Sequence, residues 1–414
     1  MSQWRKQTIA DIAAPSKNAL VGGPFGSNLV SRDYTPSGVP VIRGQNMGFG
    51  RWVSGEFVFI SEDKAEDLSA NIARPGDLVF TQRGTLGQVA IVPPASFDRY
   101  IISQSQMKLT VDPAKADTKF LFYFFTSEEQ QDYIRRNAIQ TGVPHTNLGH
   151  LRTTPLLLPP LPEQRAIAAV LGALDDKIEL NRRMNETLEA LAQSLFKSWF
   201  VDATQSALPK GWREVPFTDT VEILGGGTPK TSVAEYWDGD IPWFSVVDSP
   251  QDSDLFVIDT EKKITKAGVE NSSTQVLPVG TTIITARGTV GKIALVGVPM
   301  AMNQSCYGLR GKAGKKGFHT YFVTRALVSQ LQQHAHGSVF DTITRDTLAG
   351  VQVALPPAAV VEQFEERVSP LMERIRNNLH ESRTLAALRD ALLPRLPSGE
   401  LRLPAASGSM EARA

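Results

Sequence analysis

The 414-residue sequence has a single cysteine, Cys306, and no long apolar segment. One thiol cannot form an internal disulfide or a multi-thiolate zinc site, so a reducing compartment is expected. No run of about 18 apolar residues occurs, as a membrane span would need, and the N-terminus lacks the apolar core of a secretion signal. We therefore predict a cytoplasmic protein with no membrane span and no metal.

The sequence also lacks an excess of either charge, because 43 basic residues balance 43 acidic ones. A protein that binds DNA by itself usually carries a basic excess, since contacts to phosphates dominate its affinity. The balance argues against an autonomous DNA-binding protein. It allows a subunit whose partners supply the charge, or whose basic residues gather on one face.

Motifs for catalysis are missing as well. The segment 287–292 (RGTVGK) lacks the first glycine and the final serine or threonine of a phosphate-binding loop, and 225–231 (GGGTPKT) has a proline between its glycines and its lysine. We interpret both as turns. The six histidines share no metal-ligand spacing with carboxylates or with Cys306. We find no nucleophile elbow, and we expect no catalytic site in this chain.

The sequence does contain an internal repeat. Residues 74–92 (RPGDLVFTQRGTLGQVAIV) are similar to residues 277–296 (LPVGTTIITARGTVGKIALV), so that Arg83 matches Arg287. The spacing between the two copies drifts through this part and is constant after the diproline that follows in each copy. We therefore predict that each copy is a variable globular unit followed by a rigid helix.

Each predicted helix has apolar residues at alternating spacings of four and three, which is typical of a coiled coil. The two helices are expected to pair through Ile167, Leu171, Leu174, Ile178, Asn181, Leu188 and Leu195 in the first copy and Leu371, Ile375, Asn378, Leu385 and Leu392 in the second. Pro370 lies inside the second helical segment. Because proline removes a backbone hydrogen bond, we interpret Ser369 and Pro370 as an N-cap and a first helical residue, with a kink or break at this point.

Asn181 and Asn378 interrupt the apolar pattern near the centre of each helix. In an antiparallel pair related by a pseudo-two-fold axis the midpoints meet, so we expect these two amides to lie close together. A buried polar pair lowers stability but penalises slipped registers, since a slip leaves an amide without a partner. Replacing both with leucine should then raise thermal stability and loosen the register. The alternative is that both amides are partly solvated at a narrow seam.

The globular copies contain short strand-like runs, such as 39–43, 77–81 and 282–286, and one helical stretch each, at 119–137 and 318–334. We predict an α+β fold: two tandem α/β domains, each with a small, mostly antiparallel sheet, separated by two long antiparallel coiled-coil helices in a pseudo-two-fold internal repeat. The predicted boundaries are 1–158 for the first domain, 159–203 for the first helix, 204–357 for the second domain, 358–396 for the second helix and 397–414 for a C-terminal tail.

Several segments resemble the specificity subunits of type I restriction-modification enzymes. Residues 158–202 are similar to the first helical spacer of that family, and the duplicated order is itself typical of it. Further family-like segments are 38–47, 141–152, 226–248, 337–348 and 392–403. The second helix lacks the LPEQR phrase of the first, which leaves open whether the two helices make equivalent partner contacts.

The resemblance implies a non-catalytic subunit with two target recognition domains, each of which reads one half of a split double-stranded DNA sequence. It also implies two methyltransferase subunits that methylate adenine and two ATP-dependent restriction subunits. S-adenosylmethionine, ATP and magnesium are then expected on these partners, and no cofactor on this chain. A helix of about 35 residues is roughly 50 Å long, so such a pair would hold the domains over half-sites about 10 to 15 base pairs apart.

Two kinds of DNA contact are predicted within the recognition domains. The first is a phosphate contact from the repeated Gly-Thr loop, through Arg83 and Thr85 in one copy and Arg287 and Thr289 in the other; the alternative is that this loop is only a structural turn. Base-reading residues should instead differ between the copies, because the half-sites differ. The candidates, chosen because Arg and Lys suit guanine and Asn and Gln suit adenine, are Arg43, Gln45, Asn46, Lys230, Ser245, Lys312 and Lys315.

Two other classes of function stay open. Zero net charge also fits a scaffold in which tandem binding modules recognise protein or carbohydrate ligands. An unrecognised enzyme is disfavoured by the missing catalytic motifs. Steep weakening of duplex DNA binding between about 50 and 200 mM salt would separate a DNA-binding subunit from the scaffold.

Overall fold

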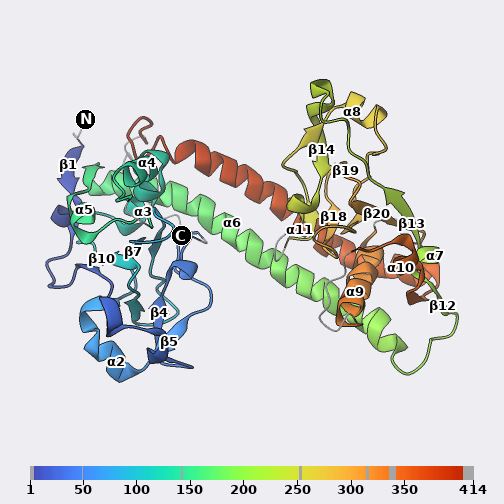
Figure 1. Ribbon diagram of the computed structural model, residues 1–414, viewed down its shortest axis with the longest axis horizontal. Helices are drawn as coiled ribbons and strands as arrows, with labels where there is room; N and C mark the ends of the chain where they lie inside the picture. Colours follow the sequence, from blue (N-terminus) through green and yellow to red (C-terminus); the bar gives the residue numbers. More distant parts are fainter. Residues whose placement is uncertain are drawn as a thin grey trace, which may run out of the picture. The chain divides into compact units, whose positions relative to one another are not determined.

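The computed structural model describes residues 4–48, 50–140, 143–250, 254–313, 317–334 and 342–403. In these residues no helix is both long and apolar enough to span a bilayer. The chain forms two compact units, Met1–Lys177 with Leu385–Ala414, and Ile178–Thr384. Each unit contains a globular head and parts of two long helices, and Figure 1 labels their elements. We name the heads by their residues: the N-terminal head is 5–158 and the C-terminal head is 213–355.

The N-terminal head combines three sheets with five α-helices. Four strands in the order β2-β10-β7-β8 form one antiparallel sheet, and five in the order β3-β5-β4-β9-β6 form another, in which β4 and β9 are parallel. The pair β1-β11 joins the start of the head to its end. The strands are β1 (Arg5–Thr8), β2 (Leu20–Gly22), β3 (Tyr34–Thr35), β4 (Val39–Ile42), β5 (Val58–Ile60), β6 (Ile72–Ala73), β7 (Leu78–Thr81), β8 (Val89–Ile91), β9 (Tyr100–Ile102), β10 (Gln106–Leu109) and β11 (Pro155–Leu158). The helices are α1 (Ile9–Ile12), α2 (Glu62–Asp67), α3 (Thr118–Thr126), α4 (Glu128–Arg136) and α5 (Leu148–Thr153).

The C-terminal head repeats this strand order. Its main sheet has the order β13-β20-β17-β18-β15, a smaller one has the order β16-β14-β19, and β12 pairs with β21. The strands are β12 (Arg213–Pro216), β13 (Val221–Gly225), β14 (Trp237–Phe244), β15 (Phe256–Val257), β16 (Lys263–Ile264), β17 (Thr282–Thr285), β18 (Ile293–Val296), β19 (Ala301–Met302), β20 (Cys306–Gly311) and β21 (Gln352–Leu355). The helices are α7 (Phe217–Thr220), α8 (Lys266–Glu270), α9 (Phe318–His334) and α10 (Arg345–Ala349). The predicted α+β class is confirmed, but the expectation of one small sheet in each copy is wrong.

One predicted helix is divided in the N-terminal head. The stretch 119–137 forms α3 and α4, which are separated by Ser127 in an extended conformation with ψ 149°. The Ser127 hydroxyl donates to the Phe124 carbonyl at 2.7 Å, because serine competes with the helical backbone for its hydrogen bonds. The matching stretch in the C-terminal head is the single helix α9.

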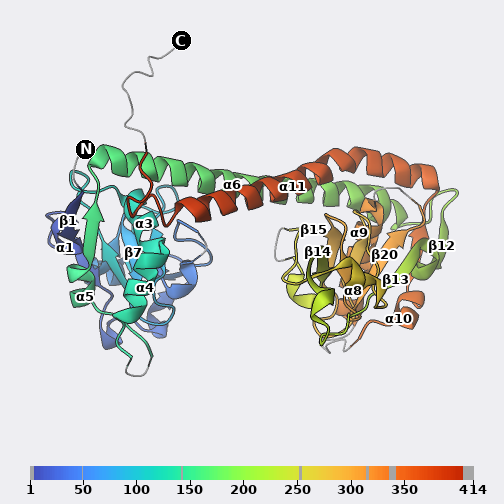
Figure 2. The ribbon, with the colours of Figure 1, turned by 90° about the horizontal axis from the view of Figure 1, so that it is seen from above.

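The long helices are α6 (Leu161–Phe196), extended by the π-helical turn η5 (Lys197–Val201), and α11 (Ala358–Leu392). In the unit Ile178–Thr384 the Asn181 amide bonds Ser382, whereas Phe196 packs on Phe364 with ring centroids 6.0 Å apart. Residues later in α6 therefore contact residues earlier in α11, so the two helices run in opposite directions, and the predicted antiparallel pairing is confirmed (Figure 2).

Helix α11 continues through Pro370 without a break. The expectation that Ser369 and Pro370 start a new helix is therefore wrong. Proline cannot bond the carbonyl four residues earlier, and Pro370 is exposed, so water can reach the unpaired carbonyl side of the helix. The carbonyl left unpaired is that of Glu366, and the Ser369 hydroxyl donates to the neighbouring carbonyl, that of Glu365.

The long helices also complete the cores of both heads. Ile167 and Leu171 of α6 are at most 1% exposed within the core of the N-terminal head, together with Leu396 from the segment after α11. In the other unit, Phe364 and Val368 of α11 are fully buried in a cluster shared with the C-terminal head. Apolar burial of this kind is the main stabilising contribution in folding, so each head depends on its share of the helices.

Candidate nucleic-acid interface

Five strand ends meet at one edge of the N-terminal head. Strands β2 and β7 end at this edge, and β10, which lies antiparallel between them, begins there. The parallel strands β4 and β9 end there too, because the N–H of Ser103, just after β9, donates to the Ile42 carbonyl at 2.9 Å. The loops 22–29, 43–47, 82–88 and 103–105 therefore lie together. We call them the N-terminal loop edge.

The C-terminal head has the same arrangement. Strands β13 and β17 end where β20 begins, and the N–H of Asn303, just after β19, donates to the Phe244 carbonyl at the end of β14 at 2.9 Å. We call the loops 226–233, 245–249, 286–292 and 303–305 the C-terminal loop edge.

Close backbone contacts hold both edges in the same way. A Cβ atom on Gly23 would lie 1.9 Å from the Ser103 carbonyl oxygen, and one on Gly226 would lie 1.9 Å from that of Asn303. No side chain fits at such distances, so glycine is required where the first loop crosses the last. The two edges are thus equivalent scaffolds that carry different side chains.

The repeated Arg-Gly-Thr loops lie on these edges. Arg83, Thr85, Arg287 and Thr289 are all exposed, and the glycines that follow the arginines have φ of 91° and 80°. Glycine is needed for this left-handed turn. A purely structural turn therefore explains the repeated glycine, but it does not explain why an arginine precedes the glycine in both copies. Neither arginine has an ion pair or side-chain hydrogen bond among the described residues. Both are therefore free to contact an anion.

Loop 43–47 of the N-terminal loop edge and loop 245–249 of the C-terminal loop edge each contain a short 3₁₀ turn. The N–H of Arg43 donates to the Asn46 side chain at 3.0 Å, and the N–H of Ser245 donates to Asp248 at 2.8 Å. Arg43 therefore occupies the same place as Ser245, and Gln45 the same place as Val247, which is 70% exposed. Gln45 is exposed and Arg43 is half-buried. These matched positions carry different side chains in the two heads.

Asn46 has a different role from the one expected. It has no exposed surface, and its side-chain N–H groups donate to the carbonyls of Ser54 at 3.1 Å and Glu56 at 2.9 Å. Because these donors and the side-chain carbonyl of Asn46 are all bonded to the backbone of the head, we assign Asn46 to stabilising loop 43–47 against residues 54–56 and not to base reading.

The structure separates the remaining candidates. Lys230 is exposed on the C-terminal loop edge. Lys312 instead follows the far end of β20, where its N–H donates to the Thr220 carbonyl at 2.9 Å and its ammonium group lies 3.4 Å from the Thr218 carbonyl. It is therefore remote from the Arg287 loop. Lys315 lies outside the described residues.

Three asparagines of the long helices, Asn181, Asn185 and Asn378, form one buried cluster. Asn181 donates to the Asn378 carbonyl at 3.4 Å, to Glu381 at 2.9 Å and to Ser382 at 3.2 Å. The side chain of Asn378 donates to that of Asn185 at 2.8 Å. The three asparagines are at most 2% exposed, so the solvated alternative is excluded. The expected pair is close in space, but the side-chain partner of Asn378 is Asn185.

The other predicted pairing residues divide by their surroundings. Ile167 and Leu171 lie in the core of the N-terminal head, and Ile375 is fully buried in the cluster with the C-terminal head. The rest are partly buried: Leu174, Ile178, Leu188, Leu195, Leu371, Leu385 and Leu392.

Buried polar contacts tie each head to the long helices, and the sequence did not predict them. The Tyr123 hydroxyl donates to Asp175 of α6 at 2.6 Å and accepts from Arg51 at 3.0 Å, and Arg51 also pairs with Asp176. Burial raises the pKa of Tyr123, so it remains a neutral donor. Tyr123 and Tyr321 each follow a phenylalanine by three residues in the matching helical stretches of the two copies, which is a sequence signal for these contacts.

The C-terminal head is attached through a similar group. Arg325 of α9 pairs with Glu189 of α6, and the charge of the same arginine acts on Tyr321. Burial raises the pKa of Tyr321 to about 12. The tyrosine is kept in both heads, whereas its charged partners come from different positions.

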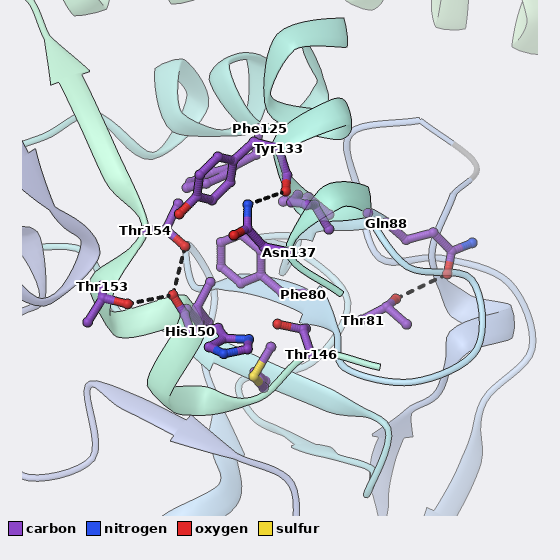
Figure 3. Close-up of a pocket in the computed structure, with 15 residues that line it drawn as sticks. Phe80, Thr81, Gln88, Phe125, Tyr133, Asn137, Thr146, His150, Thr153 and Thr154 are labelled. Carbon is purple, nitrogen blue, oxygen red and sulfur yellow. Dashed lines mark hydrogen bonds between the residues drawn. The ribbon is translucent and has the colours of Figure 1, made fainter. Parts of the chain in front are cut away.

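A small cavity lies beside the N-terminal loop edge (Figure 3). It has a volume of about 150 Å³ and an apolar floor that includes Phe80 and Phe125. Its polar side chains mostly bond neighbouring backbone: Asn137 donates to the Tyr133 carbonyl at 2.8 Å, and Thr154 to the His150 carbonyl at 2.9 Å. No lining residue is acidic, so the cavity holds no carboxylate to act as an acid or base beside a nucleophile.

Ligands for a metal do not gather in the part of the chain that the structure describes, where no group of three or more His, Cys, Asp or Glu residues could hold an ion. Cys306 is buried, and burial raises the pKa of its thiol to about 12. A metal ligand is the thiolate, which this environment disfavours.

Comparison with known proteins agrees with the two-copy architecture. Residues 24–190 and 209–382 match the family model described as type I restriction modification DNA specificity domain. The type I restriction enzyme HindI specificity subunit of Haemophilus influenzae is 22% identical over 97% of this chain and 100% of its own length. The MjaIX specificity subunit of Methanocaldococcus jannaschii is 23% identical over 97% of this chain and 94% of its own. The crystal structure of the S subunit of the type I system from M. genitalium has the same fold, with a TM-score of 0.64 and 18% identity over 95% of this chain and 96% of that one. Since the two matched segments cover most of its length, the chain belongs to the family of DNA specificity subunits of type I restriction-modification enzymes.

Proposed function

We propose that the chain reads a bipartite double-stranded DNA target with its two loop edges, one half-site at each head. The observation that carries this proposal is the convergence of equivalent strand ends in both heads. On each edge, an exposed arginine of the repeated loop lies beside positions that differ between the copies.

This combination suits the two components of DNA recognition. Phosphates are the same in every DNA, so contacts to them position a protein without specifying a base. Arg83 and Arg287 have equal places and are assigned this role, supported by the exposed Gly-Thr backbone. Bases differ between half-sites, and the side chains differ accordingly: Arg43 suits guanine and Gln45 suits adenine, whereas Val247 suits the methyl group of thymine.

Adenine methylation and DNA cleavage are assigned to partner subunits. We propose two methyltransferase subunits, which carry S-adenosylmethionine, and two restriction subunits, which carry ATP and magnesium, in a cytoplasmic complex. Large apolar side chains on the outer faces of the long helices support a docking role there: Leu180 is 53% exposed, Leu191 48% and Leu388 49%.

The long helices are proposed to set the separation of the half-sites. Helix α6 has 36 residues, which corresponds to about 54 Å at 1.5 Å per residue. At 3.4 Å per base pair this length spans about 16 base pairs.

The test replaces the two loop arginines. Arg83→Ala and Arg287→Ala are each expected to weaken binding of target and random duplex DNA alike, because a phosphate contact carries no sequence information. The slope of log K against log salt should become shallower by about 0.9 in each variant, because one DNA phosphate is no longer neutralised. Binding is measured over a salt series with the full chain purified together with its methyltransferase subunits.

Lys312→Ala provides the matched control. It removes one exposed positive charge from the same head as Arg287, but at the opposite end of β20, and should leave the slope unchanged. If both arginine variants keep the affinity and the slope of the unmodified protein, the loop edges are not the DNA-binding surface.

A further inference from the structure

The most exposed large apolar side chains of the described residues lie at the loop edges. Phe25 is 87% exposed, Val247 70% and Val143 64%. Phe25 and Val247 belong to the edge loops, and Val143 is two residues from His145, whose backbone bridges that of Arg83. Single exposed apolar residues are common on proteins, but here the three highest exposures coincide with the surface proposed to meet DNA.

The loop that carries Phe25 is held firmly. Its neighbour Pro24 is buried, as is Leu29 at the end of the loop. The Gln104 side chain donates to the carbonyls of Gly26 at 2.5 Å and Leu29 at 2.9 Å. These hydrogen bonds hold the backbone of the loop in a conformation that presents the side chain of Phe25 to solvent before any ligand arrives.

The C-terminal head has a different residue at this place. Phe25 follows the Gly-Gly pair at the end of β2 by two residues, and Thr228 follows the equivalent pair at the end of β13 by two residues. The Thr228 hydroxyl donates to Gln304, which is the counterpart of Gln104. The aromatic ring is therefore specific to the N-terminal loop edge.

We propose that Phe25 is a base-contacting wedge for the half-site read by the N-terminal head. Its ring packs against the faces of neighbouring bases and partly unstacks one base step. Aromatic side chains stack on any base, because every base presents a flat π face, and apolar wedges of this kind kink DNA when they enter a base step. A rigid loop favours this insertion, since little conformational freedom is lost on binding. The inference rests on the proposed function of the loop edges.

The experiment compares Phe25→Ala with Phe25→Leu, and with Ser27→Ala as a control. Ser27 is exposed in the same loop, so its variant tests for general disturbance of the loop. The full chain is purified with its methyltransferase subunits, and the target is located from the methylated adenines. Phe25→Ala should weaken target binding about 5- to 100-fold with an unchanged salt slope, because an apolar contact releases no counterions. Phe25→Leu should keep part of the affinity, and Ser27→Ala all of it.

Unstacking provides a second, independent measurement. The fluorescence of 2-aminopurine is measured at successive positions of the N-terminal half-site away from the methylated adenine, because a methyltransferase extrudes that base itself. It should rise at one step when the unmodified complex binds, and should not rise with Phe25→Ala. At the corresponding positions of the other half-site, again away from the methylated adenine, no rise is expected, because Thr228 takes the place of the ring. The melting temperature should stay unchanged in Phe25→Ala, since the ring is exposed.

Three results would overturn the proposal. The first is a target affinity of Phe25→Ala within twofold of the unmodified protein while Arg83→Ala still weakens binding; in that case the loop edge binds DNA without the wedge. The second is dissociation of the methyltransferase subunits from the Phe25→Ala complex with unchanged DNA affinity, which would make Phe25 a protein contact. The third is a normal affinity in the Phe25 and arginine variants together, which would remove the proposed function as well.

Discussion

The buried contact between Asn185 and Asn378 allows a direct measurement of what the polar cluster contributes to helix pairing. The two side chains are 2% and 1% exposed and share a hydrogen bond of 2.8 Å. Replacing either one with leucine leaves the other without that partner in an apolar seam. A buried polar group left unsatisfied costs about 1–3 kcal/mol, so each single variant should lose that much free energy of unfolding.

The double variant Asn185→Leu with Asn378→Leu should behave differently. Leucine has the same branching as asparagine, and replacing both partners of a hydrogen bond with apolar groups of similar shape is nearly neutral. Even with about 1 kcal/mol of overpacking, the double variant should lose clearly less than the sum of the single variants. The coupling between contacting residues is typically about 0.5–3 kcal/mol.

Hydrogen exchange of the α6 and α11 backbone around these residues measures the opening free energy for all four proteins of the cycle. Urea denaturation followed by circular dichroism gives a second value. Additive losses would refute the reasoning, because they would mean that the two amides do not share a structural role. The pair suggested by the sequence, Asn181 with Asn378, is now expected to be destabilised when both are leucine, since Asn185 would keep no partner across the seam.

Three further predictions follow from other parts of the chain. Burial lowers the pKa of His319 from 6.5 to about 4, so between these pH values the unfolded chain binds a proton that the folded chain does not, and the free energy of unfolding should fall by up to about 3 kcal/mol as the pH decreases from 6.5 to 4. In urea denaturation at pH 7 and pH 4.5, His319→Gln should lose less free energy of unfolding between the two pH values than the unmodified protein. Equal losses would contradict the lowered pKa of His319. Asp77 pairs with the buried Lys108 at 3.0 Å, so Asp77→Thr should lower the free energy of unfolding by about 3–5 kcal/mol because it leaves a buried charge without its partner. Adding Lys108→Met should recover much of this loss in thermal unfolding, since the second copy has the uncharged residues Thr281 and Gly308 at these places. No recovery would show that the loss does not come from the unpaired lysine. Deleting one seven-residue repeat from both long helices shortens each helix by about 10 Å. In a binding selection, the spacing of the half-sites should decrease by about three base pairs, while the bases read stay the same. An unchanged spacing would show that the helices do not set the distance between the half-sites.

The long helices were the part of the fold most accessible to sequence reasoning. Their apolar spacing extends over some ten turns, and the matched interruptions at Asn181 and Asn378 indicated which levels meet in an antiparallel pair. The prediction was less accurate where one residue decides the outcome. Ser127 divides a predicted helix in two, whereas Pro370, the stronger helix breaker in isolation, lies in a continuous helix packed along its length.

The candidate site was only partly accessible. The repeated arginines are conspicuous because identical residues recur in a divergent repeat. Asn46 is a candidate by its chemistry alone, and burial gives it a different role. Phe25 was missed, because its sequence context does not distinguish an exposed aromatic residue from a core one.

By itself, the sequence determined that the chain is a duplicated unit with two long helices and no catalytic motif. The duplication is visible in the matching order of residues in the two copies, and the helices are visible because the helical period assigns each residue of a segment to one face. Only the tertiary structure decided which side chains share a surface. Strand register brings together loops that lie far apart in the sequence, so the proximity of Phe25, Arg43 and Arg83, and the separation of Lys312 from Arg287, follow from strand pairing and not from any local pattern.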